Sequence, residues 1–123
     1  MVDIDTALER AMGIDGAIGA ALVDGSSGFT LGVAGDGQRD MTIAAAGNTD
    51  VVRAELRTLE MLGSDDALED MLITLDSEYH LLRLLRSGRT SGSLFLYLVL
   101  VKSRANLGLA RVQLRRIEAE LDV

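Results

Sequence analysis

Leu94-Phe95-Leu96-Tyr97-Leu98-Val99-Leu100-Val101 is an unbroken run of apolar residues near the end of the chain. The run is too short to cross a bilayer and is rich in valine and aromatic residues, which is typical of a strand covered on both faces. We therefore expect residues 94–101 to form the central strand of a sheet that has helices on either side.

A helical repeat follows this strand, after Lys102-Ser103-Arg104. Apolar residues recur at steps of three and four, which places them on one stripe of a helix, while arginines fall on its flank. The stripe consists of Leu107, Ala110, Leu114, Ile117 and Leu121, and the flank of Arg104, Arg111 and Arg115. We expect a C-terminal helix with one apolar face and one basic edge.

Turn-forming residues divide the rest of the chain into further elements. Ile4, Leu8 and Met12 lie one turn apart and predict a short helix, capped by Asp3 or Asp5 and ended by glycine. We then expect strands over 17–23 and 29–34, a helix over 40–62, strands over 69–75 and 79–85, and a polar loop over 86–93. This order predicts an α+β fold, a five-stranded and mainly antiparallel sheet with helices on both faces.

The composition excludes several kinds of site. The chain has 123 residues, no cysteine and a single histidine, His80. A chain of this length buries a core without disulfides or metal. The missing cysteines exclude a thiol nucleophile, and one histidine excludes a histidine-based metal cluster. We therefore expect one domain spanning 1–123 that binds no cofactor or metal and is not an enzyme.

The charge is unevenly distributed along the chain. The net charge is −7, and most acidic residues precede residue 79 whereas most basic residues follow it. We expect the basic C-terminal part to pack beside acidic segments of the same fold or of a second copy. Nucleic acid is not expected as a partner, because the total is acidic and no aromatic residues are interleaved with the bases.

The chain shows no sign of membrane insertion. Its first residues lack the basic and apolar regions of a signal peptide, and no apolar run reaches the roughly 20 residues that a spanning helix needs. We expect a cytoplasmic protein.

Other candidate motifs favour structural roles. The glycine clusters at 24–28 and 32–37 lack the lysine of a phosphate-binding loop and predict tight turns. Asp76 and Glu78 flank a hairpin turn and are expected to be solvated, and His80 to be a surface or edge-strand imidazole without a marked partner. Among the arginines, Arg86 and Arg89 in the polar loop are better candidates for an arginine finger than those of the last helix, because such a residue usually sits on a loop.

Two local patterns resemble those of the Roadblock/dynein light-chain family. The apolar strand at 19–23 runs into Asp24-Gly25 and Gly28, and Ala105 is followed by Leu107-Gly108 after the central strand. The order of elements over the whole chain is similar as well. The resemblance implies a Roadblock/profilin-like fold and a homodimer that binds a bacterial Ras-like small GTPase, as a GTPase-activating or scaffolding partner.

The long middle helix has a wide apolar stripe. One side carries Met41, Ala45, Val52, Leu56 and Leu59, the adjoining side Ala44, Val51 and Leu62, and Asn48 and Glu55 fall inside the stripe. A helix that also packs against a second copy uses such polar residues to fix register. A boundary position at which both side chains reach solvent explains them equally well.

The resemblance implies that two copies pair through this helix and through the neighbouring edge strand over 69–75. The core of that strand, at 71–73, is too apolar to be left as an open edge. The expected dimer contacts are Asn48, Val52, Glu55, Leu56, Leu59, Met71, Leu72 and Ile73. The expected GTPase-binding residues, beside the seam, are Arg53, Arg57 and Glu60.

Two other functions remain open. One is a structural dimerisation adaptor within a larger complex. The other is a small-ligand sensor, since similar sheet-and-helix folds hold pockets, although the sequence shows no convergent polar cluster to support it.

Overall fold

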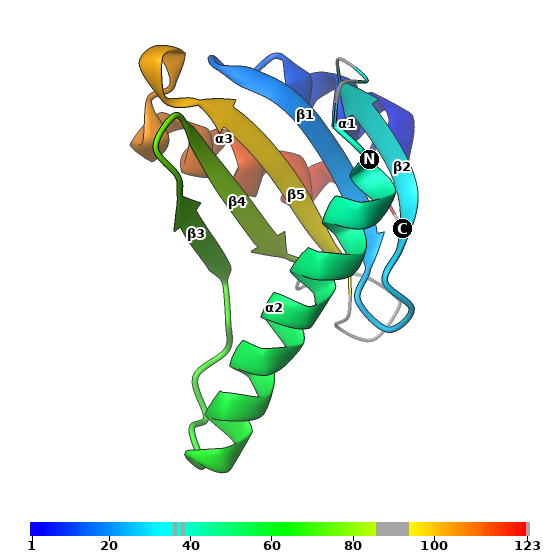
Figure 1. Cartoon of the computed structure of the whole chain (residues 1–123). Coiled ribbons are helices and arrows are strands. Elements are labelled where there is room, and N and C mark those ends of the chain that lie inside the picture. The colour runs from blue at the N-terminus through cyan, green and yellow to red at the C-terminus, as the bar shows by residue number, and fades with distance from the viewer. Residues whose placement is uncertain (36, 38, 86–93, 123) are drawn as a thin grey trace.

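The computed structural model describes residues 1–35, 37, 39–85 and 94–122. The elements, in chain order, are α1 (Ile4–Met12), β1 (Ala17–Asp24), β2 (Phe29–Gly35), α2 (Met41–Met61), β3 (Asp70–Thr74), β4 (Glu78–Leu84), β5 (Leu94–Val101), a short 3₁₀ turn (Lys102–Arg104) and α3 (Leu107–Glu120), as Figure 1 shows. This order confirms the predicted α+β class. The predicted polar loop, with Arg86 and Arg89, lies outside the described residues.

The five strands form one sheet in the order β2-β1-β5-β4-β3, and all neighbouring strands are antiparallel. The apolar run at 94–101 is β5, and it occupies the centre of the sheet as predicted. Helices α1 and α3 lie on one face of the sheet and α2 lies on the other (Figure 1). Both faces of β5 are therefore covered, which explains why the strand has no polar face.

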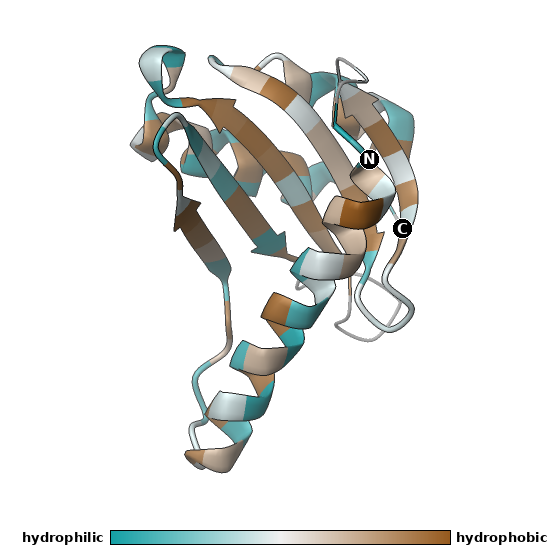
Figure 2. Ribbon diagram, in the orientation of Figure 1, coloured by the Kyte–Doolittle hydropathy of each residue, from teal (hydrophilic) through white to brown (hydrophobic). Residues whose placement is uncertain are grey.

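Alternate side chains of the sheet supply two separate cores. Leu96 and Leu98 of β5 pack toward α1 and α3, whereas Phe95, Tyr97 and Val99 pack toward α2. In Figure 2 most of β5 has the hydrophobic colour, while α2 carries mixed colours along its length. The core on the α2 side is thus built mainly by the sheet, with fewer residues from the helix.

Short polar side chains cap the helices. Asp3 accepts a hydrogen bond from the backbone N–H of Thr6, Asp40 caps α2, and Asn106 caps α3. Of the two candidates for the first cap, the structure uses Asp3. The hydrogen bonds from Thr6 hold the pKa of the Asp3 carboxyl below its ordinary value.

The basic C-terminal part pairs with acidic residues of the same fold. Arg83 of β4 and Arg111 of α3 both contact Asp70 of β3. Part of the expected packing of basic against acidic segments is therefore satisfied within one copy.

Candidate interaction site

The buried residues of helix α2 all lie at or before Val52. Its buried residues are Ala45, Thr49 and Val52, and no later residue of the helix is buried. Figure 1 shows the distal half of α2 projecting past the sheet, and the chain then returns to it through residues 62–69. The distal half therefore presents side chains that its own sheet does not cover.

The strand β3 forms one edge of the sheet. It pairs with β4, and no other described strand lies beside it. Met71 and Ile73 face the α2 side and are half-buried there, whereas Leu72 is exposed and points to the opposite face. The apolar run at 71–73 is thus split between the two faces of an edge strand, as the two-residue period of a strand requires.

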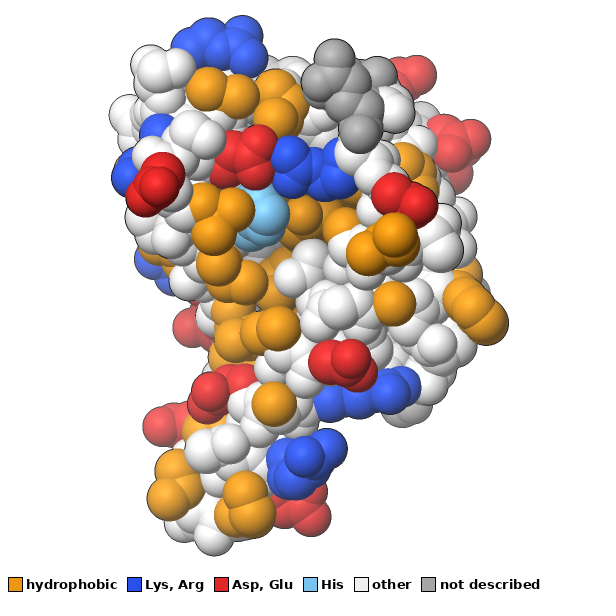
Figure 3. Space-filling view, viewed as in Figure 1, with side chains coloured by type: hydrophobic (Ala, Val, Ile, Leu, Met, Phe, Trp, Pro, Cys, Tyr) orange, Lys and Arg blue, Asp and Glu red, His pale blue; other side chains and the backbone are white. Residues whose placement is uncertain are grey.

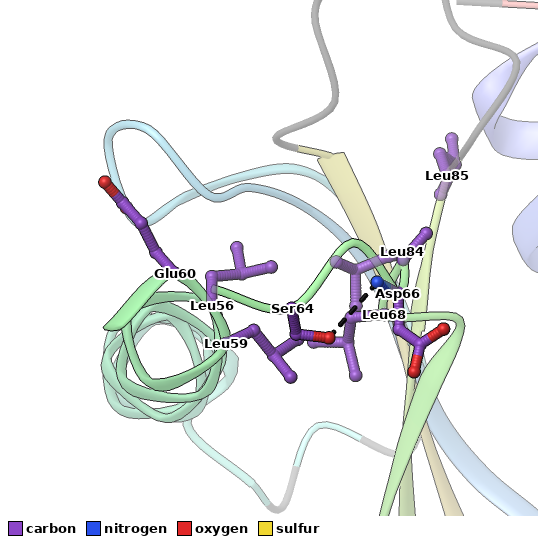
Figure 4. A pocket seen from close by; sticks show the side chains of 9 residues that line it. Leu56, Leu59, Glu60, Ser64, Asp66, Leu68, Leu84 and Leu85 are labelled. Atoms are coloured by element: carbon purple, nitrogen blue, oxygen red, sulfur yellow. Dashed lines mark hydrogen bonds between the residues drawn. The ribbon is translucent and has the colours of Figure 1, made fainter. Parts of the chain in front are cut away.

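A cavity of about 600 Å³ lies where the distal half of α2 faces the segment that leads to β3. In Figure 4, Leu56 and Leu59 of α2 point toward Leu68 and Leu84, whereas Glu60 points away from them. The backbone N–H of Asp66 donates a hydrogen bond of 3.2 Å to the Ser64 hydroxyl oxygen, which shapes the returning segment. The cavity is therefore lined mainly by leucines.

A second hollow of about 440 Å³ lies beside the first half of α2. Ile43, Asn48 and Val51 line it from the helix, and His80 and Tyr97 line it from the sheet. The side chain of Ile43 is 71% exposed. Figure 3 shows hydrophobic side chains on both sides of the histidine on this face of the molecule. An apolar and hollowed surface thus continues along α2.

A polar cluster of Arg39, Glu78, His80 and Tyr97 lies at one end of this hollow. The Arg39 guanidinium donates two hydrogen bonds to the Glu78 carboxylate, of 2.8 and 3.1 Å. The same carboxylate lies 2.9 Å from His80 Nε2, and His80 Nδ1 lies 3.4 Å from the Tyr97 hydroxyl. These four side chains therefore find polar partners in one another within the protomer.

The cluster corrects three expectations. Glu78 is not a solvated turn carboxylate, His80 has a carboxylate partner, and a convergent polar cluster does exist. The sequence does not indicate this cluster because Arg39 precedes α2 and contacts the start of β4 only in the folded chain. All the charged groups are already paired, so the cluster offers no unpaired charge to a small ligand.

No family model matches the sequence, and no curated protein matches it either. Solved structures do match the fold. MglB of Myxococcus xanthus is 19% identical and superposes with a TM-score of 0.82, covering 95% of this chain and 89% of that chain. A Roadblock/LC7 domain from Streptomyces avermitilis is 13% identical, with a TM-score of 0.80 and coverage of 96% and 93%.

This chain has the Roadblock fold. A third structure, the gliding protein MglB from Thermus thermophilus, is 19% identical over 93% of this chain and 82% of that chain, with a TM-score of 0.75. The predicted resemblance to the Roadblock family is thereby confirmed for the fold.

The expected interface residues occupy different environments in this Roadblock fold. Val52 is 4% exposed and packs in the core of its own protomer. Asn48, Glu55 and Leu59 are half-buried, and Leu56 is exposed. The contacts between two copies stay a prediction, but Val52 reaches a second copy only if its own core opens.

The expected GTPase-binding residues also differ from one another. Arg53 donates hydrogen bonds to the carbonyl oxygens of Gly25 and Ser26, so that its guanidinium fixes α2 to the β1–β2 hairpin. Arg57 and Glu60 are exposed. A charge change at Arg53 therefore disturbs the hairpin of the Roadblock fold as well as the surface.

Neither a metal-binding cluster nor a membrane-spanning helix is found among the described residues. Within residues 1–35, 37, 39–85 and 94–122, no group of three histidine, cysteine or acidic residues is arranged to hold a metal ion. No helix in that same part of the Roadblock fold is long and apolar enough to cross a membrane.

The buried phenol of Tyr97 predicts a loss of stability at alkaline pH. Burial raises the pKa of Tyr97 above its ordinary value, so the folded protein keeps this proton where the unfolded chain loses it. The contribution of this group to the free energy of unfolding is complete below about pH 10 and is lost as the pH rises through the folded-state pKa. We expect the free energy of unfolding to fall above about pH 10, and Tyr97→Phe to reduce the fall.

Urea titrations between about pH 8 and about pH 11 measure this effect. Tyr79→Phe is the matched control, because it removes the other tyrosine of the chain. An equal alkaline slope in wild type and Tyr97→Phe would contradict the assignment.

Proposed function

We propose that this chain is a non-enzymatic homodimer that binds a Ras-like small GTPase, as a regulator or scaffold. The observation that carries the proposal is the uncovered apolar surface along α2 and β3, on a chain with the Roadblock fold. Regulation of a Ras-like GTPase is what the resemblance to the Roadblock family implies.

The uncovered surface favours a second copy of the chain as its first partner. Monomeric proteins rarely expose large contiguous apolar patches, and a hollowed patch of this kind marks an interaction site. Exposed apolar side chains occur along the whole of α2, at Ile43, Val51, Leu56 and Met61. Among the described strands, β4 alone pairs with the edge strand β3, so the outer edge of β3 is also available to a partner. A two-fold dimer places the same surface on both copies and covers both helix and edge at once.

The dimer would then offer a platform to the GTPase. With α2 of each copy on the same face, the exposed Arg57 and Glu60 of both copies lie on one continuous surface. A regulator biases a switch only through different affinities for its two states. The platform therefore has to distinguish the GTP form of its partner from the GDP form.

We expect the dimer to bind a Ras-like GTPase encoded beside its gene about tenfold more tightly in the GTP form than in the GDP form. Arg57→Glu should weaken this binding because it reverses a charge on the platform, without changing the mass of the dimer. Titration calorimetry with the GTPase loaded with GDP or with a non-hydrolysable GTP analogue measures both effects.

Arg115→Glu is the control, because Arg115 is an exposed arginine of α3, on the other face of the sheet. Equal affinity for the two nucleotide states, or no binding at all, would contradict the proposal and favour the dimerisation adaptor.

A further inference from the structure

The edge strand β3 is tied to α3 by charged side chains on the face opposite α2. Asp70 is the first residue of β3, and its side chain is 12% exposed. Its carboxylate accepts two hydrogen bonds from Arg111 of α3, of 2.8 Å from Nη2 and 3.0 Å from Nε. This paired geometry is the strong arrangement for an arginine and a carboxylate.

Arg83 joins the same group from β4. It lies directly opposite Asp70 in the ladder, and its Nη1 is 3.7 Å from an Asp70 carboxylate oxygen. Its Nη2 and Nε donate hydrogen bonds of 3.2 and 3.3 Å to Glu118 of α3. Arg83 is buried, and a buried charge is tolerated only when its partners stay in place. Asp70, Arg83, Arg111 and Glu118 therefore form one unit, here named the Asp70 network.

Apart from the ladder with β4, few contacts hold β3. Among the described elements, its one extensive backbone contact is with β4, and it reaches α3 mainly through long side chains. Its α2-facing side chains, Met71 and Ile73, are only half-buried. The position of this strand relative to α3 thus depends on the Asp70 network more than on apolar packing.

We propose that the Asp70 network is a positioning device that holds β3 ready to pair with a second copy of the chain. The proposal rests on the homodimer proposed above and adds residues that lie away from α2 to those that control it. Asp70 and Arg111 act through the strand and touch no partner themselves. Because a two-fold interface contains β3 twice, any loosening of the strand weakens the dimer from both sides.

The test compares Asp70→Asn and Arg111→Gln with the control Arg115→Gln. Arg115 lies one turn after Arg111 on the same helix and is exposed. We expect each network variant to raise the dissociation constant of the dimer about tenfold, and the double variant to raise it little further because both remove one interaction. The control should leave the constant unchanged. Sedimentation across a dilution series measures these constants.

Hydrogen exchange separates positioning from a general loss of stability. The amides of 70–74 should exchange faster in both network variants while those of β5 keep their protection. The exchange of 70–74 is also compared in a Leu56→Asp background, which is expected to be monomeric, so that the result does not depend on dimerisation. A monomeric wild type would overturn the proposed dimer. Unchanged exchange over 70–74, or an equal effect of Arg115→Gln, would overturn the Asp70 network as a positioning device.

Discussion

Leu56→Asp should convert the proposed dimer into monomers. Leu56 is 39% exposed in the protomer and lines the leucine cavity beneath the distal half of α2. In the proposed dimer the substitution leaves an unpaired carboxylate in a desolvated seam, at a cost of several kcal/mol. The dissociation constant should therefore rise by at least about a hundredfold. Light scattering on the purified protein gives the mass directly.

The matched control for this variant is Leu109→Asp. Leu109 is a leucine of similar exposure on α3, away from the proposed seam. It should leave the dimer intact, since its carboxylate stays in water. If the wild type already has the mass of a monomer at tens of micromolar, the proposed dimer is wrong.

Val52→Arg should unfold the protomer itself. Val52 packs with Ala21, Val23 and Phe95 in the core on the α2 side, where a guanidinium has no partner. An unpaired buried charge lowers the free energy of unfolding by about 3 kcal/mol or more. Loss of the dimer in this variant would follow from loss of the fold, in contrast to Leu56→Asp.

Urea denaturation in the monomeric Leu56→Asp background isolates the effect on the protomer. Ala54→Arg serves as the control, because it places the same side chain on an exposed position of the same helix. Similar midpoints for the Val52→Arg and Ala54→Arg proteins would show that the site at Val52 is open to solvent.

The fold was predictable because its strongest signals are local. The apolar run of β5 requires two covered faces, and the stripe of α3 requires one, whatever the rest of the chain does. Asp3, one of the two predicted caps, likewise caps the helix that directly follows it. Each of these patterns lies within a short stretch of sequence, and the structure has the predicted element at the same residues.

The side-chain pairs at the site were not predictable, because their members lie far apart in the sequence. Arg39 meets Glu78, and Arg53 meets the carbonyl of Gly25, only when α2 lies across the sheet. Taken by its sequence neighbours alone, each of these residues is typical of a solvated loop or of an exposed helix surface. The burial of Thr49 was not predictable for a different reason. Its hydroxyl donates a hydrogen bond to the carbonyl of Ala45 within the helix, so this polar side chain tolerates burial.

The projecting end of α2 is exposed in a single copy of the chain and would be covered in the proposed dimer. After Val52 the helix has no buried residue, so its last turns lose few contacts when they unwind. Unwinding there would expose Leu56, Leu59 and Met61 in an extended segment that proteases and chaperones can bind. Pairing would hide the segment, so the lifetime of each copy would depend on its having found a partner.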